Sequence, residues 1–153
     1  MHRFRRVQEI PRPLEEVFAF FADVRHLAAI APPFLDLGWV TDPDRPIEAG
    51  SLIDYRVRLH GIPFPWRTRI LAFEPPYALA YEQARGPCRR WRHDYRFEAT
   101  PGGTVLIDDV AYDPGWGLPG RIAHHLVFRR TVQVMFDHRA RCIDHLLGPG
   151  EGA

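Results

Sequence analysis

A histidine on the apolar face of an alternating stretch is the first feature of this sequence that suggests chemistry. Residues 89–97 read RRWRHDYRF, and His93 alternates with the large rings of Trp91, Tyr95 and Phe97. The residues between them are arginines and one aspartate, so the pattern predicts a strand with one buried and one solvated face. Burying an imidazole costs free energy unless it has a hydrogen-bond partner. His93 therefore needs a polar partner on the same face.

Asp108, on the strand expected to follow, is the predicted partner. If Phe97 pairs with Thr104 across the hairpin, His93 lies opposite Asp108. Opposite residues of an antiparallel pair share a face, so both side chains would point inward. A register slip of one residue would turn Asp109 inward instead. The alternation of rings and arginines favours the register that brings His93 and Asp108 together.

A buried histidine and carboxylate have two interpretations. In the functional one, His93 and Asp108 are catalytic residues assisted by Tyr95, or they anchor the polar head of a ligand. In the structural one, the two groups satisfy each other's hydrogen bonds and hold the sheet.

Several further residues on the apolar faces carry polar groups or large rings and are candidates for a ligand cavity. Each can equally be an ordinary core residue. The predicted ligand-binding set is Tyr55, Trp66, Tyr81, Trp91, His93, Tyr95, Asp108 and Phe136.

Outward-facing arginines are the main features of the predicted surface. A basic patch would suit anionic lipid or RNA, whereas acids on the same strands, such as Glu82 and Asp94, predict a mixed solvated face. The formal net charge of +1 gives no general argument for nucleic acid, and we expect no nucleic-acid partner. Arg129 and Arg130 lie on a predicted helix, where one could reach an interior carboxylate or both could face solvent.

Composition excludes several kinds of chemistry. All 20 basic residues are arginine, so no lysine is present to form a Schiff base. The sequence has no phosphate-binding loop and no Cys/His zinc spacing, and the adjacent His124 and His125 cannot share a helix face. We expect neither a cofactor nor a metal. The polar N-terminus and the lack of a long apolar run predict a cytoplasmic protein without a transmembrane segment.

Hydrophobic periodicity predicts one strand, two short helices, a series of strands and a final long helix. The predicted helices are 13–22, 24–30 and 121–147. The predicted strands are 2–10, a weak one at 35–40, and then 52–59, 64–73, 77–83, 89–98 and 104–112. The loop 115–120 carries Trp116 and Leu118 and could cover a cavity.

This order predicts an α+β fold. A curved antiparallel sheet of six to seven strands needs cover on its apolar face, and the C-terminal helix is the element long enough to provide it. The 153 residues fit a single domain over 1–148, followed by a short tail at 149–153.

Two phrases of the sequence resemble the SRPBCC superfamily of helix-grip proteins, which includes START lipid-transfer domains and polyketide cyclase/dehydrase-like proteins. The phrases are W-x-H-x-[HY]-x-F-E followed by G-G-T-x-[LM]-x-D-x-V-x-Y, and V-x-x-M-F-x-x-R. They are carried by Trp91, His93, Tyr95, Phe97, Glu98, Gly102, Gly103, Thr104, Leu106, Asp108, Val110, Tyr112, Val132, Met135, Phe136 and Arg139. The resemblance covers nearly the whole chain and implies the helix-grip fold.

Three functions are compatible with this resemblance. The first is binding of a small hydrophobic or amphipathic ligand, such as a lipid, polyketide or aromatic compound, between sheet and helix. The second is a cofactor-independent cyclase, dehydratase or isomerase that uses His93 and Asp108. The third is binding of a macromolecular partner, as in ubiquinone-binding or ribosome-associating relatives. The sequence is also compatible with a homodimer.

Overall fold

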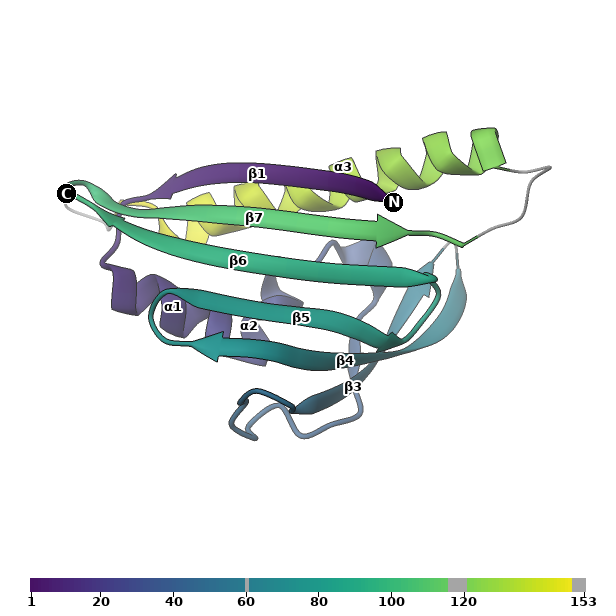
Figure 1. The fold of residues 1–153 in the computed structure, drawn as a ribbon, viewed down its shortest axis with the longest axis horizontal. Coiled ribbons are helices and arrows are strands. Elements are labelled where there is room, and N and C mark those ends of the chain that lie inside the picture. Colours follow the sequence, from purple (N-terminus) through teal and green to yellow (C-terminus); the bar gives the residue numbers. More distant parts are fainter. Residues whose placement is uncertain (60, 116–120, 150–153) are drawn as a thin grey trace.

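A computed structural model describes residues 1–59, 61–115 and 121–149 of the chain. In this part of the chain, seven strands form one antiparallel sheet with the order β1-β7-β6-β5-β4-β3-β2 (Figure 1). The strands are β1 (His2–Ile10), β2 (Gly38–Trp39), β3 (Leu52–Leu59), β4 (Ile62–Glu74), β5 (Ala78–Arg85), β6 (Arg90–Thr100) and β7 (Gly103–Asp113). From β2 to β7, strands that are neighbours in the sheet are also consecutive in sequence. The last strand, β7, then pairs with the first, β1.

Two short helices follow β1. In α1 (Leu14–Ala22), Leu14, Val17, Phe18 and Phe21 are buried, which is the spacing of one helix face. Helix α2 (Val24–Ile30) begins at Asp23, whose carboxylate caps it by accepting a hydrogen bond from the backbone N–H of Arg25. A 3₁₀ turn, η1 (Pro33–Leu35), then leads to the edge strand β2.

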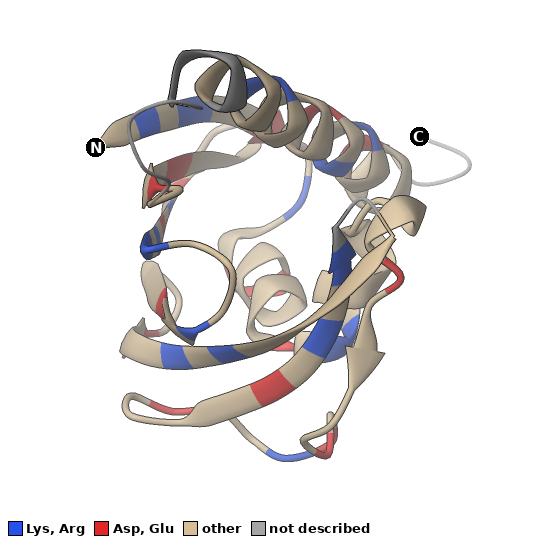
Figure 2. Ribbon diagram, turned by 90° about the vertical axis from the view of Figure 1, so that its right-hand side faces the viewer, with Lys and Arg blue, Asp and Glu red and all other residues tan. Residues whose placement is uncertain are grey.

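The long helix α3 (Arg121–Leu147) lies along the open side of the curved sheet (Figure 2). Its buried residues include Val132, Phe136, Ile143 and Leu147, which recur at helical spacing. Side chains of β1 hold it in place: Gln8 donates to the backbone oxygen of Ala140 over 3.1 Å. This is the helix-grip fold, and the α+β prediction is confirmed.

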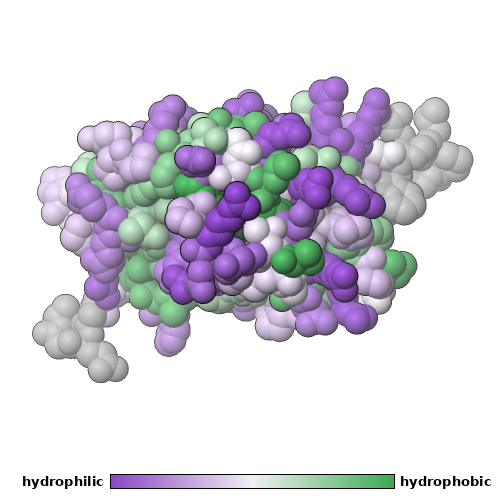
Figure 3. All heavy atoms as spheres, turned by 90° about the horizontal axis from the view of Figure 1, so that it is seen from below, coloured by the Kyte–Doolittle hydropathy of each residue, from purple (hydrophilic) through white to green (hydrophobic). Residues whose placement is uncertain are grey.

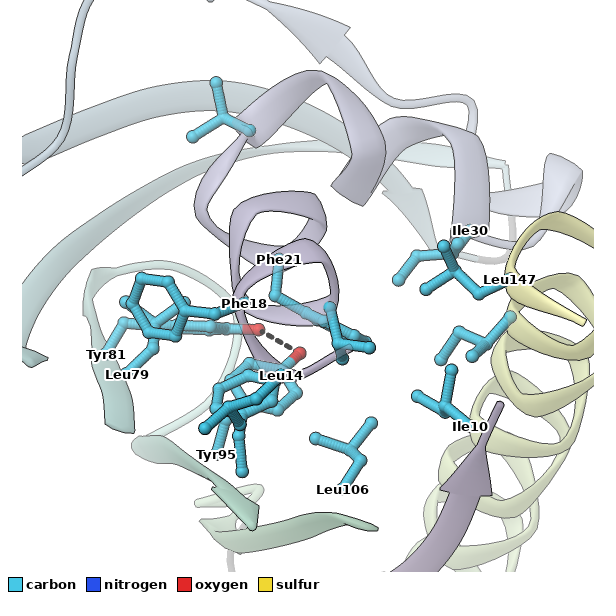
Figure 4. Close-up of a cluster of buried hydrophobic side chains, with 14 of the residues drawn as sticks. Ile10, Leu14, Phe18, Phe21, Ile30, Leu79, Tyr81, Tyr95, Leu106 and Leu147 are labelled. Carbon is cyan, nitrogen blue, oxygen red and sulfur yellow. Dashed lines mark hydrogen bonds between the residues drawn. The ribbon is translucent and has the colours of Figure 1, made fainter. Parts of the chain in front are cut away.

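The buried side chains form two clusters at different places along the sheet. One joins α1 to the middle of the sheet and includes Phe18, Phe21, Tyr95 and Phe97 (Figure 4). The other joins α3 to the far ends of β6 and β7 through residues such as Trp91. Both clusters combine aromatic with aliphatic side chains.

The predicted register of β6 and β7 is wrong by two residues. Phe97 pairs with Leu106 rather than with Thr104, and His93 lies opposite Val110. The pairing continues to Thr100 and Gly103, so the hairpin loop is shorter than the sequence analysis assumed. Because the shift is an even number, each side chain keeps its predicted face.

Smaller differences affect the region between α2 and β3. The predicted weak strand at 35–40 is reduced to the two residues of β2, preceded by η1. Trp116, Leu118 and residues 150–153 of the predicted tail lie outside the described residues. Among the described helices, none is long and apolar enough to cross a membrane.

Candidate functional site

A cavity lies between α3 and the strands β3 to β6, closed at one side by α2, η1 and β2. Its volume is about 120 Å³, well above the roughly 10–15 Å³ that one water molecule requires on the same measure. The lining is mainly apolar and aromatic. It consists of Leu27, Ala31, Pro32, Leu35, Leu37, Trp39, Tyr55, Val57, Trp66, Tyr81, Cys88, Trp91, His93, Phe128, Thr131, Val132, Met135 and Arg139.

The structure separates the predicted ligand-binding residues into two groups. Tyr55, Trp66, Tyr81, Trp91 and His93 line the cavity. Tyr95, Asp108 and Phe136 are buried behind this wall and do not line it.

Rings of the first group pack against one another. Tyr55 stacks on Trp66, with ring centroids 6.1 Å apart and planes inclined by 14°. Trp66 in turn meets Trp91 edge to face, with centroids 5.9 Å apart. Such offset and edge contacts hold the rings at defined angles. The rings of the aromatic wall therefore support one another.

His93 and Asp108 are in contact, as the sequence analysis expected, but diagonally rather than directly across the hairpin. The Nε2 of His93 makes a hydrogen bond to Oδ1 of Asp108. Directly opposite Asp108 is Tyr95, one residue pair further along the same face. Both side chains are almost completely buried, at 1% and 6% exposure.

Burial determines the charge states of this pair. Removal from water lowers the pKa of His93, so its imidazole is neutral near pH 7. Burial alone would raise the pKa of Asp108, but His93 and Arg139 outweigh it and lower that pKa. Asp108 is therefore a carboxylate that can only accept, which places the proton of the neutral imidazole on Nε2.

The other imidazole nitrogen extends the contact into a chain of hydrogen bonds. Because Nδ1 of His93 carries no proton, it accepts from the hydroxyl of Tyr81, 2.9 Å away. The Tyr81 oxygen lies 3.4 Å from the hydroxyl of Tyr95, and this contact is visible in Figure 4. Tyr95 in turn accepts from Nη2 of Arg139. Every bond can thus point the same way, from the guanidinium to the carboxylate.

The two tyrosines in this chain keep their protons. Burial raises the pKa of Tyr81 and raises that of Tyr95 well above the usual value, although the nearby Arg139 opposes both shifts. Their hydroxyls are therefore donors as well as acceptors at neutral pH. His93 lines the cavity, but both of its nitrogens have protein partners, so the hydroxyl of Tyr81 connects the imidazole to the cavity for proton transfer.

Arg139 is the site residue that the sequence analysis missed. Its side chain is buried, lines the cavity and lies over the rings of Tyr95 and Phe136. The two arginines considered instead, Arg129 and Arg130, are exposed. Arg139 follows Phe136 by three residues and precedes Ile143 by four, so the helical apolar stripe could have identified it.

A second, smaller cavity lies behind the first. Its volume is about 20 Å³, and it shares Leu27, Tyr55 and Tyr81 with the larger one. The hydroxyl of Tyr55 lies 3.1 Å from Oγ1 of Thr68. The two tyrosines thus divide the interior of the protein into two compartments.

Cys88 is not placed as a nucleophile. Burial raises the pKa of Cys88 to about 12, so its thiol stays protonated inside the cavity wall. The sulfur of Cys142 lies 3.3 Å from Nε2 of His138, on the same helix. Among the described residues, no group of three or more histidine, cysteine or acidic side chains could hold a metal ion.

The outer arginines lie beside acids. Arg67 bonds Asp54 over 2.7 Å, and Arg92 bonds Asp94 over 2.9 Å. In Figure 2 the arginines alternate with other residues along the outer strands, and in Figure 3 hydrophilic and hydrophobic side chains are interspersed on the face shown. This arrangement is a mixed solvated surface rather than a continuous basic patch.

Comparison with known families identifies the class of protein. Residues 10–137 match the family described as polyketide cyclase / dehydrase and lipid transport, and the chain belongs to this family. Membership implies binding of a hydrophobic ligand of the lipid or polyketide type. A comparison with curated protein sequences found no match.

Solved structures share the fold at low sequence identity. CV1439 from Chromobacterium violaceum is 15% identical, with a TM-score of 0.73 over 96% of this chain and 97% of its own. Ara h 8.0201 is 16% identical, with a TM-score of 0.62 over 93% of this chain and 97% of its own. A nucleoside-diphosphate sugar epimerase from Corynebacterium glutamicum is 22% identical, with a TM-score of 0.62 over 92% of this chain and 28% of its own.

Proposed function

We propose that this protein binds a small hydrophobic or amphipathic ligand in the cavity between the sheet and α3. The observation that carries the proposal is the aromatic lining of that cavity, which Tyr55, Trp66 and Trp91 form through contacts with one another. Apolar pockets with a few polar groups are the usual sites for such ligands. The family and the fold support the same function.

Native mass spectrometry of the freshly purified protein, with organic extraction of bound material, tests this proposal. Thr131 lines the cavity from α3, whereas Gln133 is exposed two residues further along the helix. We expect a bound molecule in the wild type and in Gln133→Trp, and its loss in Thr131→Trp, in which an indole fills the cavity. Equal retention by both variants would show that the ligand lies elsewhere.

A cofactor-independent cyclase, dehydratase or isomerase is the second candidate, favoured by the hydrogen-bond chain that reaches the cavity at Tyr81. The Tyr81 hydroxyl could take a proton from a substrate while its own proton passes to Nδ1 of His93, which forms an imidazolium beside the carboxylate of Asp108. Asp108 and Tyr95 would act through this chain, since neither lines the cavity.

Proton exchange of a ketone probe separates the enzyme from the binding protein. General base catalysis would accelerate deuterium incorporation next to the carbonyl of 2-tetralone in D₂O. Tyr81→Phe should then slow the exchange about a hundredfold, whereas Tyr55→Phe, on the same cavity, should leave it unchanged. Exchange no faster than in buffer alone would argue against the enzyme and leave the binding function in place.

A further inference from the structure

The buried polar atoms of the cavity wall that lack a hydrogen-bond partner are all donors. Among the buried side-chain atoms of the described residues, two lack a hydrogen-bond partner: Nε1 of Trp66 and Nε of Arg139. Both are N–H donors, and both residues line the larger cavity. Leaving such donors unpaired costs about 1–3 kcal/mol each. A molecule in the cavity that supplies acceptor atoms would remove this cost.

The charge of the wall is also one-sided. Arg139 is the one charged side chain among the described residues that line the cavity, since His93 is neutral. Arg139 forms no ion pair within the described residues, and its Nη2 donates to the neutral hydroxyl of Tyr95. The carboxylate of Asp108 is turned away from the cavity and bonded to His93. Arg139 and Asp108 therefore influence each other's pKa through space but form no ion pair, and the described lining of the cavity has no negative group beside the guanidinium.

The shape of the donor group selects among anions. A guanidinium presents its N–H groups in a planar fork that matches the two oxygens of a carboxylate. A phosphate would bring up to two charges and a third oxygen, and the described lining offers no second cation to bind them. The remaining lining is aromatic or aliphatic, which suits the body of an organic acid rather than a sugar.

We infer that the ligand of this cavity is an organic acid, whose carboxylate binds Arg139 and Trp66 and whose apolar body lies among the aromatic side chains. This inference rests on the proposed function and narrows it to one chemical class. The acid can have a flat ring system or an aliphatic chain, because both present the same carboxylate to Arg139.

Calorimetry with matched pairs of probes tests the inference. 2-Naphthoate and 2-naphthamide share a flat body, and decanoate and decanamide share a linear one. At pH 7.5 both acids are ionised. We expect the wild type to bind at least one acid about tenfold to a hundredfold more tightly than its amide, as for a hydrogen bond between buried charged groups. The pair with the larger preference for the acid indicates whether the body of the ligand is flat or linear.

Substitutions test which residues cause the preference for the acid over the amide. Arg139→Met keeps the length and the apolar contacts of the side chain and should abolish the preference for the acid while the amide still binds. The matched control, Arg130→Met, removes an exposed arginine from the same helix and should leave the preference intact. If Arg139→Met does not fold, Trp66→Phe decides, because it removes an indole N–H and should reduce the preference severalfold.

The outcomes distinguish this inference from the proposed function. Equal binding of acid and amide by the wild type would overturn the organic acid and leave the hydrophobic cavity supported. A preference for the acid that survives Arg139→Met, or that Trp66→Phe does not change, would place the anion elsewhere and overturn the inference. Binding of none of the four probes would count against both.

Discussion

At the scale of single residues, the neutral state of His93 has a measurable consequence. In the folded protein burial lowers the pKa of His93 below its usual value of 6.5. Below that pH the unfolded chain therefore binds a proton that the folded protein excludes. The stability due to the neutral imidazole is present above pH 6.5 and is lost as the pH falls toward the folded pKa.

We therefore predict that wild-type stability decreases between pH 7 and pH 5 by up to about 1.4 kcal/mol per pH unit. His93→Gln, which keeps a donor for Asp108, should remove most of this slope in urea unfolding. The control His145→Gln changes an exposed histidine and should retain it. Asp108 does not contribute in this window, because its pKa is lowered from 3.8. A slope of the opposite sign would mean that His93 is protonated and forms an ion pair with Asp108.

The contact between His93 and Asp108 could be predicted from the sequence, but the residues around it could not. Alternation along β6 and β7 placed His93 and Asp108 on one face, and an error of two residues in register did not change that face. Arg139 was missed because an isolated arginine in a long helix is usually solvent-exposed. Its burial depends on contacts with Tyr95 and Phe136 that no local pattern describes.

At the scale of elements, the β6–β7 hairpin depends on one glycine. Gly103 has a φ of +144°, and a Cβ there would lie 2.2 Å from the backbone oxygen of Ile10. This close approach joins the start of β7 to the end of β1. It is also where the predicted register was wrong, since sequence patterns do not show how far pairing extends into a loop.

Gly103→Ala should therefore destabilise the protein by at least about 1–3 kcal/mol, because neither backbone can move away without breaking strand pairs. Gly102→Ala provides a matched control, since nothing lies within 4 Å of a Cβ at that position. Urea unfolding of both variants measures the difference. Equal stability of the two variants would show that the end of the hairpin adapts easily.

At the scale of the whole molecule, stability should be uneven across the sheet. Strands β6 and β7 are long and paired on both sides, whereas β2 has two residues and pairs with β3 alone. The cavity lies toward the weaker side, where α2, η1 and β2 supply part of its lining. The order of helices and strands could be predicted because apolar residues recur with a clear period in each element. The difference in stability across the sheet depends on the strand lengths, which this pattern does not determine.

Hydrogen exchange followed by mass spectrometry should show this gradient. We expect the amides of β6 and β7 to exchange slowest, by global unfolding, and those of 33–39 to exchange fastest, by local opening. The loss of protection near η1 and β2 would give a ligand a route to the cavity without unfolding the sheet. Uniform protection across the strands would contradict this prediction.

The wall between the two cavities has a consequence for selectivity. Tyr55 and Tyr81 stand between the cavities, and hydrogen bonds to Thr68 and His93 hold them in position. A ligand that displaces both tyrosine side chains to reach the second compartment loses these bonds, at about 0.5–1.5 kcal/mol each. The tyrosine pair therefore acts as a length gauge: molecules that end at this wall keep the full binding energy, and longer homologues lose part of it with no change in the chemistry of their head group.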